Sequence, residues 1–205
     1  SEFQKRATEL ILKKNIISGY EPNKSQSTII CSGTGSGKTL SFYAAALTYV
    51  ANNILSDDSH RVQILAIYPR NELLKDQLSV VYKESRLLDN FLKKKNKRVI
   101  KVGTLYGETY NSHKLDEIVS NGKINFELMK CPKCDGKLFW DDKDRRQGIE
   151  NLECSKCSHK ILSDEISLTR ESVLPDILFT TTEMMNIHLS NPNLNHFFGI
   201  YDEYR

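Results

Sequence analysis

Two patterns of apolar residues alternate along this chain. Short apolar runs bounded by polar or turn-forming residues predict strands, and they cover residues 28–31, 62–68, 99–106 and 175–179. Between these runs apolar residues recur every three or four positions, which predicts helices over 3–17, over 40–55, from Asn71 onward and over 183–189. The helix from Asn71 is expected to direct these side chains into a core: Leu73, Leu74, Leu78, Val81 and Leu88.

Strands that alternate with helices of this length imply crossover connections. They therefore predict an α/β fold with a mainly parallel sheet and helices on both faces. Such sheets bind their ligands at the carboxyl ends of the strands. The pattern breaks between residues 130 and 160 and then returns. We expect one α/β domain formed by residues 1–125 and 166–205, into which residues 126–165 are inserted as a small module.

Two pairs of cysteines with CxxC spacing mark the inserted segment, Cys131 with Cys134 and Cys154 with Cys157. Each pair forms a tight turn that presents two sulfurs, and two such pairs are typical of a zinc site. Apolar residues between the pairs are too few for a core, so the metal would supply much of the folding free energy of a zinc-ribbon-like module. Four thiolates leave no open position for water, which indicates structural zinc. The fifth cysteine, Cys31, is expected to be a buried apolar residue.

The composition is that of an ordinary soluble globular protein, with 205 residues of which 39% are apolar and 27% charged. A net charge of +3 permits nucleic acid as a partner without arguing for it. The most basic run, residues 93–98, is expected to end a long helix, where its cations suit the helix dipole. The sequence has neither a stretch long enough to span a membrane nor a secretion signal, so we expect a cytoplasmic protein with no membrane partner.

The segment between the first predicted strand and the next helix is rich in glycine and reads Ser32-Gly33-Thr34-Gly35-Ser36-Gly37-Lys38-Thr39. Its glycines allow the backbone to wrap around a polyphosphate, with N–H groups directed at the anion. Lys38 would reach the β- and γ-phosphates, and the hydroxyl of Thr39 would hold Mg²⁺. Ser32 stands where the pattern requires glycine, and a small residue still fits there. The predicted nucleotide-binding residues are Gly33, Thr34, Gly35, Ser36, Gly37, Lys38 and Thr39.

A P-loop by itself leaves kinases, GTPases, AAA ATPases and helicases open, and three later segments narrow the choice. Residues 69–77 resemble motif Ia of superfamily 2 helicases, residues 103–109 resemble the strand and glycine turn that follow it, and residues 180–185 resemble motif Ib. The resemblance is to the first RecA-like domain of a DEAD/DEAH-box helicase, which uses ATP and Mg²⁺. It implies that Gln4 recognises adenine. It also implies nucleic-acid contacts by Pro69, Arg70, Asn71, Thr104, Gly107, Thr180, Thr181 and Thr182.

Two further features bear on this resemblance. Asp202 and Glu203 follow a short apolar run, as the motif II pair that binds Mg²⁺ and positions the attacking water does in the family. Tyr204-Arg205 departs from the usual continuation, so the alternative that Asp202 and Glu203 form a surface turn stays open.

The long helix from Asn71 and the cysteine-rich insertion resemble the large helicases of bacterial anti-phage defence systems. This resemblance implies other defence proteins as partners.

The resemblance implies an ATP-dependent helicase or translocase acting on nucleic acid, with DNA favoured over RNA. Such a motor closes its nucleotide site against a second RecA-like domain, before which this chain ends, so weak nucleotide binding and poor hydrolysis are expected of this chain alone. Two alternatives stay open. One is a P-loop NTPase switch or kinase whose zinc module recognises a partner. The other is a non-catalytic binding module, in which the zinc knuckle recognises a partner or nucleic acid and the nucleotide site is vestigial. For residues 180–182, capping of the following helix alone also stays open.

Overall fold

The computed structural model describes residues 2–13, 27–31, 37–189, 191 and 197. These residues divide into two compact units, Ser1–Asp57 and Asp58–Arg205, which are described separately. The first unit contains helices α1 (Glu2–Leu12) and α2 (Lys38–Ser56), which pack against each other. The predicted helices over 3–17 and 40–55 are thus confirmed in the described residues.

The predicted strand over residues 28–31 is wrong. Residues 27–31 have no regular secondary structure, because the segment takes part in no ladder of backbone hydrogen bonds. Ile29 is 86% exposed, and Cys31 is exposed where we expected a buried residue. The apolar character of this segment therefore does not make it a strand.

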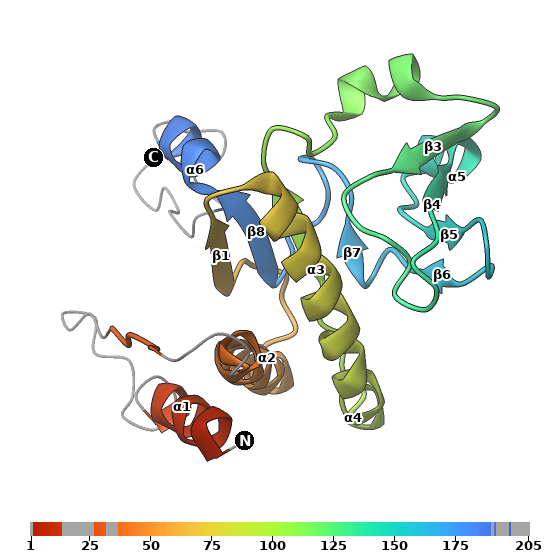
Figure 1. Cartoon of the computed structure of the whole chain (residues 1–205). Helices are drawn as coiled ribbons and strands as arrows, with labels where there is room; N and C mark the ends of the chain where they lie inside the picture. The colour runs from red at the N-terminus through yellow and green to blue at the C-terminus, as the bar shows by residue number, and fades with distance from the viewer. Residues whose placement is uncertain (1, 14–26, 32–36, 190, 192–196, 198–205) are drawn as a thin grey trace, which may run out of the picture. The chain divides into compact units, whose positions relative to one another are not determined.

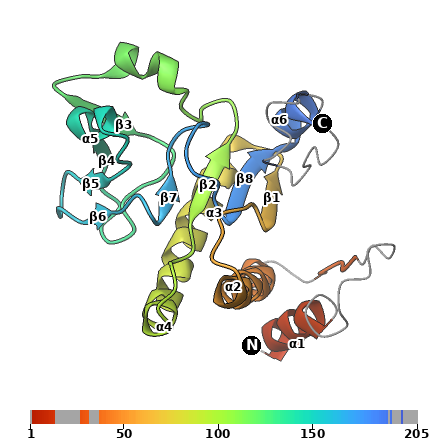
Figure 2. The ribbon, with the colours of Figure 1, turned by 180° about the vertical axis from the view of Figure 1, so that it is seen from behind.

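The second unit is built on a parallel sheet with the strand order β1-β8-β2-β7 among the described residues. The α/β fold with a parallel sheet is thus confirmed. Helix α3 contacts β1 and β8 and covers one face of the sheet (Figures 1 and 2). The elements of this layer are β1 (Ile64–Tyr68), α3 (Asn71–Ser85), η2 (Arg86–Leu88), α4 (Asp89–Lys94), β2 (Val102–Leu105), β7 (Ile166–Ser167), β8 (Ile177–Thr181) and α6 (Thr182–His188).

The core of this unit follows from the apolar pattern. All five residues of β8 are buried, as expected for a strand that has neighbours on both sides and is covered by other elements. Leu74 and Leu78 of α3 are fully buried, and each contributes about 1.5–3 kcal/mol of stability. Leu73 is 43% exposed and was wrongly assigned to the core, because it lies on the outer side of the helix.

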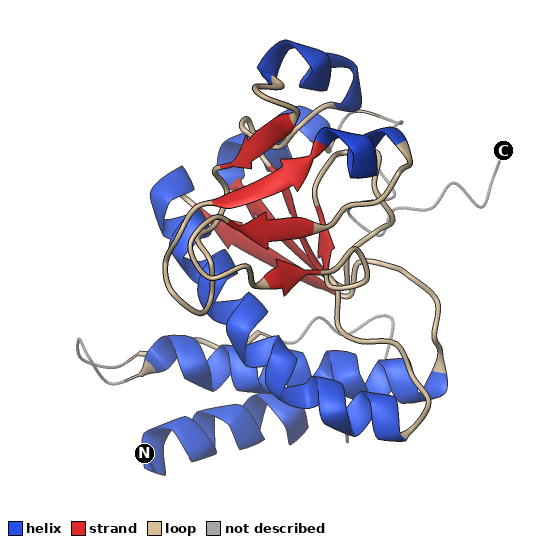
Figure 3. Ribbon diagram, turned by 90° about the vertical axis from the view of Figure 1, so that its right-hand side faces the viewer, coloured by secondary structure: helices blue, strands red, loops and turns tan. Residues whose placement is uncertain are grey.

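A second, antiparallel sheet lies beyond the β7 edge of the parallel sheet (Figures 1 and 2). Figure 3 shows strands in red and helices in blue. The hydroxyl of Tyr110 donates to the carbonyl of Asn125 at 2.7 Å, which connects this sheet to the loop after β2. Its elements are η3 (Ser112–Ile118), β3 (Lys123–Phe126), β4 (Leu138–Asp141), α5 (Asp142–Arg146), β5 (Leu152–Cys154) and β6 (Lys160–Ile161).

Asp176 connects three strands at the amino ends of the parallel sheet, and its side chain is fully buried. Arg98 donates to both carboxylate oxygens, at 2.6 and 2.8 Å. Gln63, before β1, donates to the same carboxylate at 2.9 Å, and so does the backbone N–H of Lys101, before β2. The buried charge is therefore fully hydrogen-bonded, which is the condition for its being tolerated in the core.

Asp176→Ala is expected to lower the free energy of unfolding by about 3–5 kcal/mol, because Arg98 loses its buried counter-charge. Urea unfolding of the two proteins measures the difference. Asp116→Ala is the matched control, since Asp116 also pairs with an arginine but its side chain is 75% exposed, and its loss should cost less than about 1 kcal/mol. Equal losses in the two variants would show that the Asp176 network does not stabilise the sheet.

Candidate functional site

The described end of the P-loop lies beside the glutamine that was predicted to recognise adenine. Gly37 precedes α2 in a left-handed conformation with φ of 77°, and no side chain caps the helix. The side-chain amide of Gln4 donates to the carbonyl of Gly37 at 3.3 Å. A Cβ atom at residue 37 would lie 2.1 Å from Nε2 of Gln4, so both the backbone conformation and the close approach require glycine.

Helix α1 holds this arrangement in place through a second contact, in which the hydroxyl of Thr8 donates to the carbonyl of Ser41 at 2.9 Å. Lys38 and Thr39 form the first turn of α2 and are half-buried. The N–H groups and the dipole at a helix start without a side-chain cap favour an anion at this point. Gly33, Thr34, Gly35 and Ser36 lie outside the described residues.

The segments resembling motifs Ia and Ib follow β1 and β8, so they meet at the carboxyl edge of the parallel sheet. Pro69 and Arg70 come directly after β1 and are exposed. Asn71 donates to Oε1 of Glu108 at 3.1 Å, and Lys75 forms an ion pair with Oε2 of the same residue at 2.7 Å. Glu108 thus connects the loop after β2 to the start of α3, a role for which its sequence context gave no signal.

Three of the predicted threonines direct their hydroxyls inward and are at most 5% exposed. Thr104 and Thr109 share a hydrogen bond of 3.0 Å, and Thr180 donates to the carbonyl of Leu105 at 2.6 Å. Thr181 accepts a hydrogen bond from the N–H of Met184 at 3.3 Å and is the N-cap of α6. Of the eight predicted contacts to nucleic acid, the structure exposes these four: Pro69, Arg70, Gly107 and Thr182.

Arg170 is a cation at the same edge that the sequence analysis missed. It lies shortly after β7, a strand of only two residues that the apolar pattern does not reveal. Its guanidinium donates to the carbonyl of Tyr106 at 3.3 Å. Together with Gly107 and Lys114 it lines a hollow of about 340 Å³ beside the loop after β2.

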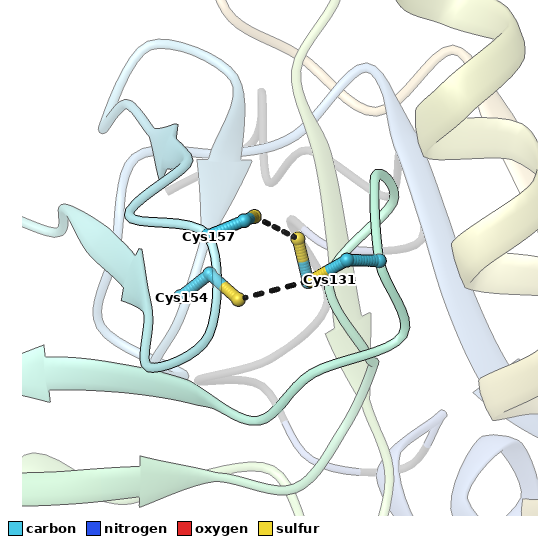
Figure 4. Close-up of side chains that lie close together, drawn as sticks. Cys131, Cys154 and Cys157 are labelled. Atoms are coloured by element: carbon cyan, nitrogen blue, oxygen red, sulfur yellow. Dashed lines mark hydrogen bonds between the residues drawn. The ribbon is translucent and has the colours of Figure 1, made fainter.

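The four cysteines of the two CxxC pairs come together as predicted, with all four sulfurs within 4.8 Å of one another. The Sγ atoms of Cys131 and Cys157 are 3.6 Å apart, and those of Cys134 and Cys154 are 3.5 Å apart. Figure 4 shows the sulfurs of Cys131, Cys154 and Cys157 converging. Tetrahedral zinc with bonds of about 2.3 Å requires sulfurs about 3.8 Å apart, whereas a disulfide requires about 2 Å. The cluster therefore fits zinc and not a disulfide.

The two CxxC turns have the same backbone geometry. The backbone N–H of Asp135 donates to the carbonyl of Cys131 at 3.0 Å, and the backbone N–H of Ser158 donates to the carbonyl of Cys154 at 3.1 Å. Asp135 and Ser158 both adopt left-handed conformations, with φ of 56° and 53°. A Cβ atom on Gly136 would lie 2.9 Å from the sulfur of Cys154. The approach of the two turns thus requires glycine on one of them.

The surroundings of the cluster raise the pKa of one thiol, that of Cys131, and lower the pKa of another, that of Cys154. Burial raises the pKa of Cys131. Burial alone would also raise the pKa of Cys154. Hydrogen bonds from the backbone N–H groups of Cys157 and Lys156 and from the thiols of Cys134 and Cys131 together outweigh it, and the pKa of Cys154 falls to about 6. One of these donors, the N–H of Lys156, lies 3.4 Å from the sulfur of Cys154. Such N–H groups stabilise a thiolate, which is the form that binds metal.

The parallel α/β sheet and the sequence around Gly37 and Lys38 define a P-loop nucleotide-binding protein. The family model described as DEAD/DEAH box helicase matches residues 1–154, and the chain belongs to this family. The resemblance to the first RecA-like domain of a superfamily 2 helicase is thereby confirmed, and the chain is an ATP-dependent, helicase-like domain. Neither a curated protein nor a solved structure matches it. Asp202 and Glu203 lie outside the described residues.

None of the helices in the described part of the chain is long and apolar enough to cross a lipid bilayer.

Proposed function

We propose that this chain is the ATP-binding domain of a nucleic-acid helicase or translocase that acts on DNA in the cytoplasm. The observation that carries the proposal is the hydrogen bond from Gln4 to Gly37. It supports the assignment of Gln4 as the glutamine that recognises adenine in this family. In this assignment Lys38 stabilises the charge on the transferring phosphate, and backbone N–H groups of residues 33–37 hold the polyphosphate.

Two groups would hold Mg²⁺, the hydroxyl of Thr39 and the carboxylates of Asp202 and Glu203. When bound, the metal supplies positive charge between the β- and γ-phosphates. Thr39 belongs to the first turn of α2, directly after Lys38. A second RecA-like domain would complete the site, and hydrolysis would alternate closed and open arrangements of the two domains.

The track for nucleic acid would run along the carboxyl edge of the parallel sheet. Arg70 and Thr182 are exposed there and can donate to phosphate oxygens. The inward hydroxyls of Thr104, Thr180 and Thr181 would support the loops and not touch the polymer. Because phosphates carry no base identity, binding along this edge would tolerate any sequence.

Steady-state ATP hydrolysis of the complete protein, with and without single-stranded DNA, duplex DNA and RNA, tests this proposal. We expect stimulation by DNA. Arg70→Ala should weaken the apparent affinity for the polymer about three- to tenfold and lower the salt dependence by about one phosphate contact. Turnover without polymer should not change.

Arg146→Ala is the matched control, because Arg146 is 70% exposed and lies on α5, away from the proposed track. An identical loss of affinity in both variants would count against the proposed track. Turnover that no polymer stimulates would favour the alternative of a P-loop switch or kinase.

We also propose that residues 126–165 form an insertion whose fold depends on zinc bound by Cys131, Cys134, Cys154 and Cys157. The sulfur distances and the repeated turns support a closed, structural site. Exposed lysines at 133, 137, 156 and 160 surround the cluster and favour an anionic partner.

The long helix and the cysteine insertion support a role in bacterial anti-phage defence, with other defence proteins as partners. Plating of phage on cells that carry the complete protein, beside the Lys38→Ala variant, tests that assignment.

A further inference from the structure

A surface formed by η2, α4 and the turn after them has no part in the proposed function. It combines exposed apolar side chains with a run of lysines. Leu87 is 74% exposed and Phe91 is 46% exposed. We name this surface the α4 patch, and it consists of Leu87, Phe91, Lys93, Lys94, Lys95 and Lys97. Helix α4 lies at the end of α3 that is away from α6 and from the carboxyl ends of the strands (Figures 1 and 2).

The backbone under the α4 patch is well ordered by hydrogen bonds. Leu92 is fully buried and anchors α4 in the core. Its carbonyl accepts hydrogen bonds from the N–H groups of Lys95 and Lys97, both at 3.0 Å. Asn96 ends the helix in a left-handed conformation with φ of 57°. The lysines are thus presented on a fixed turn.

The apolar and cationic parts of the patch are close together along η2, α4 and the turn after them. Leu87 and Phe91 are four residues apart, and Lys94 and Lys95 follow Phe91 by three and four residues. Residues at these spacings are neighbours on a helix surface. Exposed apolar surface is therefore bordered directly by positive charge.

Within residues 86–98 a single carboxylate, which interacts electrostatically with Lys93, faces these four lysines. Asp89 is the one acidic residue between positions 86 and 98. Its side chain is 14% exposed and forms an ion pair of 3.5 Å with Arg86. The dipole of α4 accounts for cations at the end of the helix, but it does not account for the exposure of Leu87 and Phe91. Adjoining apolar residues left in water next to an excess of positive charge are typical of an interaction site.

We propose that the α4 patch docks an acidic segment of a partner protein. Apolar side chains of that segment would cover Leu87 and Phe91, and its carboxylates would face the lysines. Charge complementarity with the lysines requires a negatively charged partner. The exposure of Leu87 favours a protein partner over nucleic acid. Single-stranded nucleic acid stacks its bases on aromatic rings such as that of Phe91, and it gains little from an aliphatic side chain such as that of Leu87. The patch acts independently of ATP hydrolysis.

The test uses the complete protein and a fluorescent helical peptide that has leucines on one face and glutamates on the other. A peptide of the same composition in scrambled order is the reference probe. The helical peptide should bind more tightly than the scrambled one. The double variant Lys94→Glu/Lys95→Glu should weaken its binding at least about tenfold, because two favourable charge pairs become repulsive. Leu87→Ser/Phe91→Ser should weaken it by a similar factor.

Matched variants elsewhere in the same unit control for the change in net charge and for non-specific binding to exposed apolar side chains. Lys123→Glu/Lys143→Glu makes the same charge change at exposed positions of the antiparallel module. Ile118→Ser removes an apolar side chain that is 46% exposed, as Phe91 is. Both controls should leave peptide binding within about twofold of the original value. The single variant Leu87→Ser, at a largely exposed position, guards against a folding effect.

The proposal is overturned if the helical peptide binds no better than the scrambled one. It is also overturned if the control variants lose as much affinity as the patch variants. Binding of an oligothymidylate that depends on Lys94 and Lys95 but not on Leu87 would replace the protein partner with nucleic acid.

Discussion

Lys38→Ala is expected to lower the DNA-stimulated ATP hydrolysis of the complete protein by a factor of about 100–1,000. In the proposed site the ammonium of Lys38 is the cation that the P-loop directs at the β- and γ-phosphates, where negative charge shifts during transfer. Loss of one such donor from a preorganised site costs this much in turnover. Steady-state hydrolysis at saturating ATP and DNA measures the effect.

Three further measurements would show that the loss of hydrolysis is specific to the ammonium of Lys38. Lys38→Arg should also be inactive, because a planar guanidinium does not fit the place of a compact ammonium. Lys143→Ala, at an exposed position in the other unit, should hydrolyse ATP normally. The thermal unfolding midpoints of all three variants should match that of the original protein. Near-normal turnover of Lys38→Ala would defeat the assignment of the P-loop.

Gln4 offers a separate check on the proposed site, because its side chain donates a hydrogen bond to the carbonyl of Gly37. The close approach leaves no room for a side chain at residue 37. The two residues therefore constrain each other, although more than thirty positions separate them in the sequence.

Cys154→Ser is expected to remove bound zinc from the insertion and to loosen its antiparallel sheet. A serine hydroxyl is a poor zinc ligand, so the tetrahedron loses one corner. Because metal binding supplies much of the folding free energy of such a module, amide hydrogen exchange in β4 and β5 should become at least about a hundredfold faster. Zinc content and exchange rates of the purified protein measure the two effects.

Cys31→Ser is the matched control, since Cys31 is the cysteine outside the cluster and is exposed. It should keep about one zinc ion per chain. Exchange in β1 and β8 should stay slow in both variants, because the parallel sheet has its own core. Unchanged zinc content in Cys154→Ser would refute the proposed ligands.

Local sequence was sufficient wherever the deciding interactions lie within a few residues. The cysteine pairs form turns whose hydrogen bonds span four residues, so their spacing alone indicated the cluster. The helical spacing in α2 and α3 and the threonine cap of α6 are local in the same sense. The buried run of β8 also stood out, because a strand covered on both faces is apolar throughout.

Interactions between distant segments could not be read from these patterns. The local sequence gives no sign that Arg98, which lies 78 positions earlier, compensates the buried charge of Asp176. Glu108 gave no sign of its contacts with α3. The hydroxyls of Thr104 and Thr180 resembled contacts to nucleic acid, but neighbouring elements bind them. Residues 28–31 were apolar enough for a strand and form none.

The sequence by itself therefore determined the α/β class, helices α1, α2, α3 and α6, the convergence of the four cysteines and the helicase family. The tertiary structure decided which of the predicted residues face solvent at the carboxyl edge, how Gln4 meets Gly37, and that Leu87 and Phe91 stay exposed beside four lysines. The physical reason is that backbone conformation and spacing are set by near neighbours in the chain. Burial and the pairing of charges depend on segments that only folding brings together.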